Sequence, residues 1–223
     1  MATAVGLSNL VLAPHPDDET FGCGGTLAHL ASRGAHVDVA FMTRGEMGFE
    51  TQGQANPSSQ QNLGEQRIRE ARVACGLLGV SEPLFLDGQD SRLAQQPELI
   101  QQIINLLHKG KYQRIFCPWP GDSHIDHVAT YQLMRQAVVS SQWVGDVWLY
   151  EIWSPLRPNL VLPIDKTIGH KLAAAGAYQS QLSVLDYRTA FQGLASYRSL
   201  FCAPAQFAEA FFTCDSTSLP EGA

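Results

Sequence analysis

The sequence of 223 residues predicts an α/β fold with a mostly parallel sheet and helices on both faces. Short apolar or alternating runs, typical of strands, take turns along the chain with longer stretches of helical periodicity. Glycine stands just after several of the helical stretches, where it readily ends a helix. No internal repeat is present, and the length is sufficient for one sizeable hydrophobic core. We therefore expect one domain covering residues 1–223.

The first part of the chain contains three predicted strands and two predicted helices. The strands cover residues 10–13, 36–43 and 83–86, and the helices cover residues 19–33 and 66–78. Gly34 and Gly79 follow the two helices. Before the second helix, residues 44–63 are rich in Gly, Gln, Asn and Ser, which predicts a long loop. Loops of that length in compact domains are usually functional or mobile.

Three further strands and three further helices are predicted up to residue 178. The strands cover residues 114–117, 147–152 and 159–164, and the helices cover residues 97–108, 127–141 and 166–178. Strands that alternate with helices of ten or more residues indicate βαβ units and a mostly parallel sheet. In such sheets, ligands bind beyond the carboxyl ends of the strands.

The composition argues against several classes of protein. Charged residues make up 16% of the chain and the formal net charge is -6, which disfavours disorder and a nucleic-acid or anionic-membrane partner. A substrate is then neutral, or bound through a few local cations. The first twelve residues lack the basic start of a signal peptide, and no apolar run reaches the ~18 residues of a membrane span. Five cysteines without CxxC spacing indicate a reduced, cytoplasmic protein.

Two clusters of His and Asp residues each follow a predicted strand. The first, Pro14-His-Pro-Asp-Asp18, comes directly after residues 10–13, and the second, His124-Ile-Asp-His127, follows the strand at 114–117 and a short loop. Because both clusters stand at carboxyl ends of strands, we expect them to share one site. A polar cluster of this density is costly to bury unless its groups are paired or bind a ligand.

The spacing of these residues is suited to a catalytic metal. His15 and Asp18 are three residues apart, so their side chains converge as a turn tightens into a helix, and His127 supplies a third ligand from the second cluster. Two His and one carboxylate leave a position open for water, as in catalytic zinc sites. Zinc in such a site lowers the pKa of bound water to about 7. Iron(II) would fit the same ligands.

The neighbouring residues are suited to the proton transfers of a hydrolase. Asp17 is the candidate general base, and it can return the proton to a leaving amine. His124 is the candidate donor to the oxyanion of a tetrahedral intermediate. Asp126 is expected to hold His124 in one tautomer and to favour its charged form.

Other interpretations of these segments exist. Asp17, Asp18 and Glu19 are also suited to cap the first turn of a helix, but capping explains neither the histidine before them nor the second cluster. Gly22-Cys-Gly-Gly25 lacks the spacing of a dinucleotide-binding loop. Arg44 is a candidate for the pocket lining.

Several aromatic and amide residues also bear on the site. Trp119 and Trp153 lie near the predicted site, where packing in the core or at the rim is the better interpretation. Gln179 and Gln181 have the pattern of ordinary solvated positions. None of these four residues is predicted to take part in the chemistry.

At these residues the chain resembles the PIG-L/LmbE-like family of zinc-dependent deacetylases. The first family motif, approximately (A/P)HPDDE, is present at residues 14–19, and the second, HxDH, is present at residues 124–127. Further matches are found at Thr43-Arg-Gly-Glu46, Arg67-Ile-Arg-Glu70 and Tyr150-Glu-Ile-Trp-Ser-Pro155. The similarity runs from about residue 10 to residue 178, and the pair of motifs is far more specific than either alone.

The resemblance implies a Rossmann-like fold that hydrolyses an N-acetyl group, usually from an N-acetylglucosamine-type sugar. By matching position it implies the same assignments as the spacing: His15, Asp18 and His127 as zinc ligands, Asp17 as base, and His124 with Asp126 as the oxyanion-stabilising pair. Arg67 and Asp90 are similar to family residues that bind sugar hydroxyls. Some members carry a Tyr where this chain has Asp122, a departure that concerns the substrate rather than the chemistry.

The leading hypothesis is therefore a zinc-dependent hydrolase that removes an acetyl group from a small N-acetylated amino-sugar conjugate. Two alternatives stay open. One is another metal-dependent hydrolase acting on a different amide or on an ester, and the other is a metal-bound binding subunit without turnover. A binding subunit would have no need of Asp17. A homo-oligomer is compatible with all three.

Overall fold

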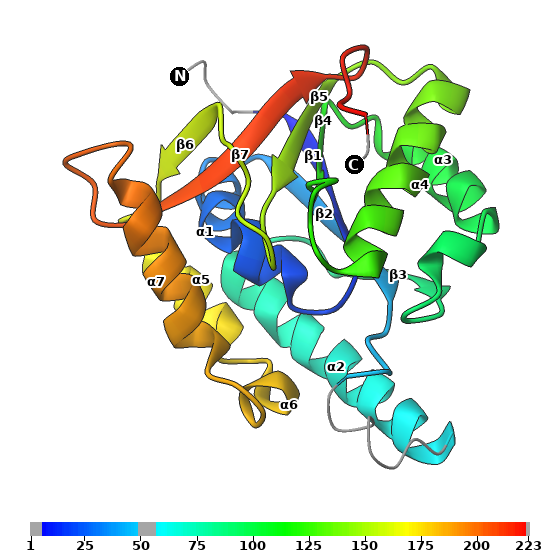
Figure 1. Cartoon of the computed structure of the whole chain (residues 1–223), viewed down its shortest axis with the longest axis horizontal. Helices are drawn as coiled ribbons and strands as arrows, with labels where there is room; N and C mark the ends of the chain where they lie inside the picture. Colours follow the sequence, from blue (N-terminus) through cyan, green and yellow to red (C-terminus); the bar gives the residue numbers. More distant parts are fainter. Residues whose placement is uncertain (1–5, 49–56, 222–223) are drawn as a thin grey trace.

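The computed structural model describes residues 6–48 and 57–221, which form one seven-stranded sheet flanked by helices (Figure 1). The strands lie in the order β3-β2-β1-β4-β5-β7-β6. Strands β1 to β5 are parallel, whereas β7 is antiparallel to both β5 and β6. The mostly parallel sheet predicted from the sequence is confirmed. The strands are β1 (Ser8–Ala13), β2 (His36–Thr43), β3 (Leu84–Gly88), β4 (Arg114–Pro118), β5 (Asp146–Tyr150), β6 (Leu160–Pro163) and β7 (Ala208–Asp215).

Helices cover both faces of the sheet, as the alternating pattern predicts (Figure 1). Along β1, Val11 and Ala13 belong to the core beneath α1, α2, α5 and α7, whereas Leu10 and Leu12 belong to the core beneath α3 and α4. This alternation is the period of two that a strand imposes on its side chains. The helices are α1 (Asp18–Ser32), α2 (Pro57–Leu78), α3 (Glu98–Gly110), α4 (Ile125–Ser141), α5 (Ile168–Ala175), α6 (Gln179–Leu182) and α7 (Tyr187–Ser199).

Helix α2 corrects the long loop predicted before residue 66. Residues 57–63 form the first turns of this helix, and residues 49–56 of the predicted loop lie outside the described residues. The sequence hides this start because Ser, Gln and Asn predominate there and give no apolar period. The later turns of α2 anchor it in the core through Ala71 and Ala74, which are fully buried.

The chain after residue 178, for which no element was predicted, contains α6, α7 and β7. Strand β7 inserts between β5 and β6. Its apolar pattern is interrupted by Glu209, a buried carboxylate that accepts hydrogen bonds from the backbone N–H groups of Gly25 and Thr26 in α1. Among the described helices, none combines the length and the apolar character needed to span a lipid bilayer.

Candidate active site

The two His/Asp clusters meet at one edge of the sheet, as predicted. Strands β1 and β4 are paired in parallel, so their carboxyl ends lie side by side. Residues 14–17 connect β1 to α1, and residues 119–124 connect β4 to α4. The ring of His15 lies with its centroid 4.9 Å from that of His124 and 5.7 Å from that of His127. The sheet topology therefore builds one site from two distant segments.

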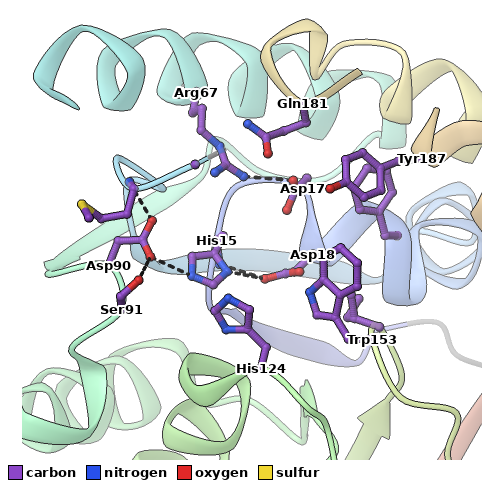
Figure 2. A pocket seen from close by; sticks show the side chains of 14 residues that line it. His15, Asp17, Asp18, Arg67, Asp90, Ser91, His124, Trp153, Gln181 and Tyr187 are labelled. Atoms are coloured by element: carbon purple, nitrogen blue, oxygen red, sulfur yellow. Dashed lines mark hydrogen bonds and ion pairs between the residues drawn. The ribbon is translucent and has the colours of Figure 1, made fainter. Parts of the chain in front are cut away.

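The turn into α1 is strained at Asp17. This residue has φ of +131°, a conformation that costs a non-glycine residue free energy and often marks functional sites. Its side chain makes no capping hydrogen bond to α1, so the capping interpretation does not explain it. Instead Glu19 accepts the Asp17 N–H and the hydroxyl of Tyr178 through its two carboxylate oxygens. Glu19 thus supports the turn, which leaves the Asp17 carboxylate directed at the pocket (Figure 2).

Two of the predicted metal ligands, His15 and His127, both contact a carboxylate oxygen of the third, Asp18. Oδ2 of Asp18 lies 3.2 Å from Nδ1 of His15 and 3.3 Å from Nε2 of His127. Burial would raise the pKa of Asp18, but the two imidazoles outweigh it and hold that pKa well below its usual range. Burial would lower the pKa of His127, yet Asp18 and Asp122 raise it to about 9. Burial would also lower the pKa of His15, but its carboxylate partners, chiefly Asp126, raise that pKa well above its usual value.

This cluster has the composition of a cation site. Within the described part of the chain, neither ring nitrogen of the fully buried His127 has a hydrogen-bond partner. Nitrogens that are orphaned beside carboxylates are suited to bind a metal. Two sets of ligand atoms among the described residues lie within 4.8 Å of one another, His15 with His124 and His127, and His15 with Asp90 and Asp126. The predicted set with Asp18 is not one of these two, so the geometry admits His124 as an alternative ligand. Five buried carboxylates surround the imidazoles: Asp17, Asp18, Asp90, Asp122 and Asp126.

Arg67 is buried against Asp17 rather than exposed to the pocket mouth. Its Nη2 donates to Asp17 Oδ2 at 2.9 Å and to the carbonyl of Pro16, and its Nη1 donates to the carbonyl of Gly45 at 3.0 Å. Gly45 is suited to this position, because its φ is +68° and a Cβ there would come within 2.4 Å of the guanidinium as it is placed. Burial raises the pKa of Asp17 to about 8, although the Arg67 guanidinium lowers it.

His124 and Asp126 are arranged differently from the prediction. Nδ1 of His124 accepts the backbone N–H of Asp126 at 3.2 Å, which leaves the proton of a neutral ring on Nε2. The Asp126 carboxylate turns away from His124 and accepts from Ser91 N at 2.6 Å, from Leu93 N at 3.3 Å, and contacts His15 Nε2 at 3.2 Å. Burial and the neighbouring imidazoles lower the pKa of His124. The Asp126 carboxylate raises the pKa of His124 as expected, but burial and the neighbouring imidazoles outweigh it, so the expectation of a charged His124 is corrected. The first turn of α4 directs that carboxylate to other partners, and the backbone N–H of Asp126 contacts the ring instead.

A pocket of about 660 Å³, including its open mouth, lies over these residues (Figure 2). Asp90 lines it beside His15, with Oδ1 at 3.4 Å from His15 Nε2, and accepts from Met47 N at 3.0 Å. The rings of Trp153 and Tyr187 form the wall across from Asp90 (Figure 2). These two rings meet edge to face, with centroids 5.9 Å apart. The lining of the pocket therefore combines carboxylates with aromatic rings.

Three expectations about the lining are changed by the structure. Arg44 does not line the pocket and forms an exposed ion pair with Asp87, so the expectation that it lines the pocket is corrected. Gln181 was expected to be solvated, yet it is only 6% exposed and lines the pocket. Tyr187 was missed because it begins α7, in the part of the chain where no element was predicted. Neither residue belongs to a local motif that would reveal it.

The fold and the site together define a metal-dependent hydrolase of the deacetylase class. The chain belongs to the PIG-L family, whose model, described as GlcNAc-PI de-N-acetylase, matches residues 10–138. This match contains both His/Asp motifs and also Arg67 and Asp90, whereas Trp153, Gln181 and Tyr187 come after it. The resemblance stated from the motifs is confirmed.

Individual proteins agree with this family. The 1D-myo-inositol 2-acetamido-2-deoxy-alpha-D-glucopyranoside deacetylase of Mycobacterium sp. (strain KMS) is 29% identical over 78% of this chain and 74% of its own length. The conserved protein TT1542 of Thermus thermophilus is 30% identical, with a TM-score of 0.78 over 92% of this chain and 94% of that chain. The N,N'-diacetylchitobiose deacetylase of Pyrococcus horikoshii, at 24% identity and a TM-score of 0.83 over 94% of this chain and 84% of that chain, shows the same fold.

Proposed function

We propose that this protein hydrolyses the acetamide of a small N-acetylglucosamine-type conjugate, with zinc held by His15, Asp18 and His127. The observation that carries the proposal is the convergence of both imidazoles on Asp18 Oδ2, at 3.2 and 3.3 Å, beside an acidic pocket. The named activities of the relatives, on an inositol glycoside and on diacetylchitobiose, support the substrate class. Zinc, when bound, polarises the acetamide carbonyl and acidifies a water molecule.

The residues of the chain supply the proton transfers. Asp17 faces the pocket, so its carboxylate accepts a proton from the attacking water and returns it to the departing amine. A pKa of about 8 for the buried Asp17 suits a group that must both gain and lose a proton near neutral pH. Arg67 holds this carboxylate in place from α2.

His124 supplies the stabilisation of the oxyanion. Its Nδ1 is occupied by the Asp126 N–H, so Nε2 is the donor, and the residue lines the pocket. A neutral imidazole donates this hydrogen bond as well, so the lowered pKa of His124 is compatible with the role. We prefer Asp18 to His124 as the third ligand because Asp18 contacts both other ligands directly.

The outer pocket favours a conjugate without negative charge. Among the described lining residues the single Lys or Arg is Arg67, whose two terminal nitrogens already donate to Asp17, Pro16 and Gly45. A carboxylate on the conjugate would lose hydration in this pocket without gaining a counter-ion. We therefore propose a neutral sugar or polyol as the group attached to N-acetylglucosamine.

Release of acetate tests the activity and the substrate together. We would incubate the protein, stripped of metal and then loaded with Zn²⁺, with N-acetylglucosaminyl inositol, N,N'-diacetylchitobiose and N-acetylglucosaminyl malate. We expect zinc-dependent release from one or both neutral conjugates and much less from the malate conjugate. No release from any of them at full zinc occupancy would favour a binding subunit. Faster release from the malate conjugate would contradict the proposal that the attached group is neutral, but not the proposed deacetylation.

The ligand assignment has its own test. Substitution of His15, Asp18 or His127 by Ala removes one ligand, so we expect zinc content and acetate release to fall together. Elemental analysis of the purified variants measures the zinc. Substitution of His124 by Ala should lower acetate release and leave the zinc content unchanged. A loss of zinc in His124→Ala with full retention in Asp18→Ala would replace Asp18 by His124 in the ligand set.

A further inference from the structure

The buried carboxylate of Asp122 has no part in the function proposed above. Asp122 lies in the loop between β4 and α4, and its side chain is completely shielded from solvent. Its Oδ1 accepts the backbone N–H of His124 at 2.9 Å, and its Oδ2 accepts the backbone N–H of Trp153 at 3.0 Å. Burying a carboxylate this deeply costs free energy of folding unless its oxygens accept hydrogen bonds or face an opposite charge.

The remaining neighbour of Asp122 is His127. Oδ1 of Asp122 lies 3.4 Å from Nδ1 of His127, while Nε2 on the other side of the same ring faces Asp18 at 3.3 Å. No other partner of Nδ1 is found among the described residues. The imidazole of His127 is therefore placed between two carboxylates, one at each nitrogen.

The second imidazole of the site repeats this arrangement. Nδ1 of His15 faces Asp18 at 3.2 Å, and Nε2 of the same ring faces Asp126 at 3.2 Å. A metal-ligating histidine normally donates its other N–H to a carboxylate or a carbonyl, which selects the tautomer and orients the ring. In each ring, the nitrogen away from Asp18 has such a carboxylate beside it.

We propose that Asp122 is a positioning residue of the metal centre, whose Oδ1 accepts the Nδ1–H of His127 and so directs the Nε2 lone pair at the metal. The inference rests on the proposed metal centre but not on the substrate. Through His124 N and Trp153 N, the same carboxylate also links the ligand to the loop after β5 that forms one wall of the pocket.

Metal affinity tests the proposal directly. Asp122→Asn preserves the shape of the side chain but removes its negative charge, and its NH₂ group cannot accept the N–H of Trp153. Loss of such a partner typically weakens metal binding about 10–100-fold. We would measure the dissociation constant for Zn²⁺ by competition with a chromogenic chelator and expect a weakening in that range.

The chain offers a matched control in Asp165, whose Oδ1 accepts the backbone N–H groups of Gln206 at 2.7 Å and Phe207 at 3.3 Å away from the pocket. Asp165→Asn also weakens a contact between a carboxylate and backbone amides, so we expect its Zn²⁺ affinity to equal that of the unsubstituted protein. Equal affinity in Asp122→Asn and Asp165→Asn would overturn the proposal.

A measurement on the unsubstituted protein keeps the proposal testable if Asp122→Asn does not fold. The ring nitrogens of His127 can be distinguished by ¹⁵N NMR of the Zn²⁺-loaded protein. We expect a protonated Nδ1 and a metal-bound Nε2, and the reverse assignment would overturn the proposal. Neither measurement needs turnover. A failure to release acetate would therefore contradict the proposed deacetylation without affecting the proposed role of Asp122.

Discussion

The C-terminal part of the chain buries its charges in balanced pairs, whereas the site between β1 and β4 buries an excess of carboxylates. Nζ of Lys171 donates to Glu209 at 2.6 Å and to the carbonyl of Phe21 at 2.8 Å. Glu209 in turn accepts from Gly25 N and Thr26 N. The pair ties α1 to β7 and α5.

A second balanced pair lies nearby. Arg198 of α7 donates through Nε to Glu151 at 2.7 Å, and its Nη2 donates both to Glu151 and to the carbonyl of Leu156. Glu151 also accepts the Leu156 N–H at 2.8 Å. Each charged group here has an opposite charge and further hydrogen bonds, which is the condition under which buried ions are tolerated.

The site between β1 and β4 meets these conditions only in part, as at Asp17, which pairs with Arg67. Its carboxylates outnumber the single guanidinium of Arg67, both nitrogens of His127 lack hydrogen-bond partners among the described residues, and Asp17 is strained. Balanced and fully bonded charge holds a fold together by itself. Unbalanced charge with orphaned nitrogens is completed by a cation and a substrate. The difference separates structural from functional burial without reference to any motif.

The largest expected effect comes from Asp17. In Asp17→Asn the side chain keeps its shape but cannot accept a proton, and loss of a general base typically costs about 10²–10⁴-fold in kcat. We expect the zinc content to stay near that of the unsubstituted protein. Steady-state acetate release with elemental analysis measures both quantities. A rate within threefold of the original, about 0.7 kcal/mol in the barrier, would move the base elsewhere.

Breaking one of the balanced pairs should lower the stability of the fold and leave the metal site unaffected. Arg198→Ala leaves Glu151 buried without its counter-ion, which typically destabilises a protein by about 3–5 kcal/mol. We expect denaturant-induced unfolding to show a much smaller free energy of unfolding, with the Zn²⁺ affinity unchanged. The double variant Glu151→Gln/Arg198→Met removes both charges and should be more stable than Arg198→Ala. Unchanged stability in Arg198→Ala would show that this pair does not hold the fold.

Arg67 lies in the candidate active site, yet it also forms a balanced pair with Asp17 and fixes the turn into α1. Arg67→Ala should lower kcat rather than only raise KM, which differs from the substrate-binding role implied by the family resemblance. The guanidinium lowers the pKa of Asp17, and an adjacent Arg typically contributes one to three pKa units, so about 10–10³-fold of rate at neutral pH depends on it.

The sign of this effect can be read from a pH profile. The base acts when deprotonated, so kcat rises as the pH rises through the pKa of Asp17, and removal of Arg67 raises that pKa. The rise of kcat should therefore move to higher pH in Arg67→Ala. A change in KM at constant kcat, with an unshifted profile, would return Arg67 to substrate binding.

The smallest effect is expected at Arg44. This side chain is 46% exposed and pairs with the exposed Asp87, and exposed pairs contribute about 0–1 kcal/mol. Arg44→Ala should leave kcat, KM and Zn²⁺ affinity unchanged and alter stability by less than that amount. A raised KM would place Arg44 in the substrate site after all.

The sequence by itself determined the architecture and the meeting of the two His/Asp clusters, because both follow from local patterns along the chain. Strand β2 has the predicted bounds, since residues 36–43 alternate in a way that only a strand satisfies. His15, Asp18 and His127 could be predicted to share one site because each cluster follows a strand, and parallel strands bring their carboxyl ends to one edge.

The tertiary structure alone decided which partners these residues have. The Asp126 carboxylate reaches His15 and the loop after β3, Arg67 reaches Asp17 across fifty positions, and Gln181 reaches the pocket from α6. No periodicity or spacing constrains such contacts. They depend on how helices and loops distant in the sequence pack over the sheet, and a buried polar group takes its partner from whatever that packing brings within hydrogen-bond distance.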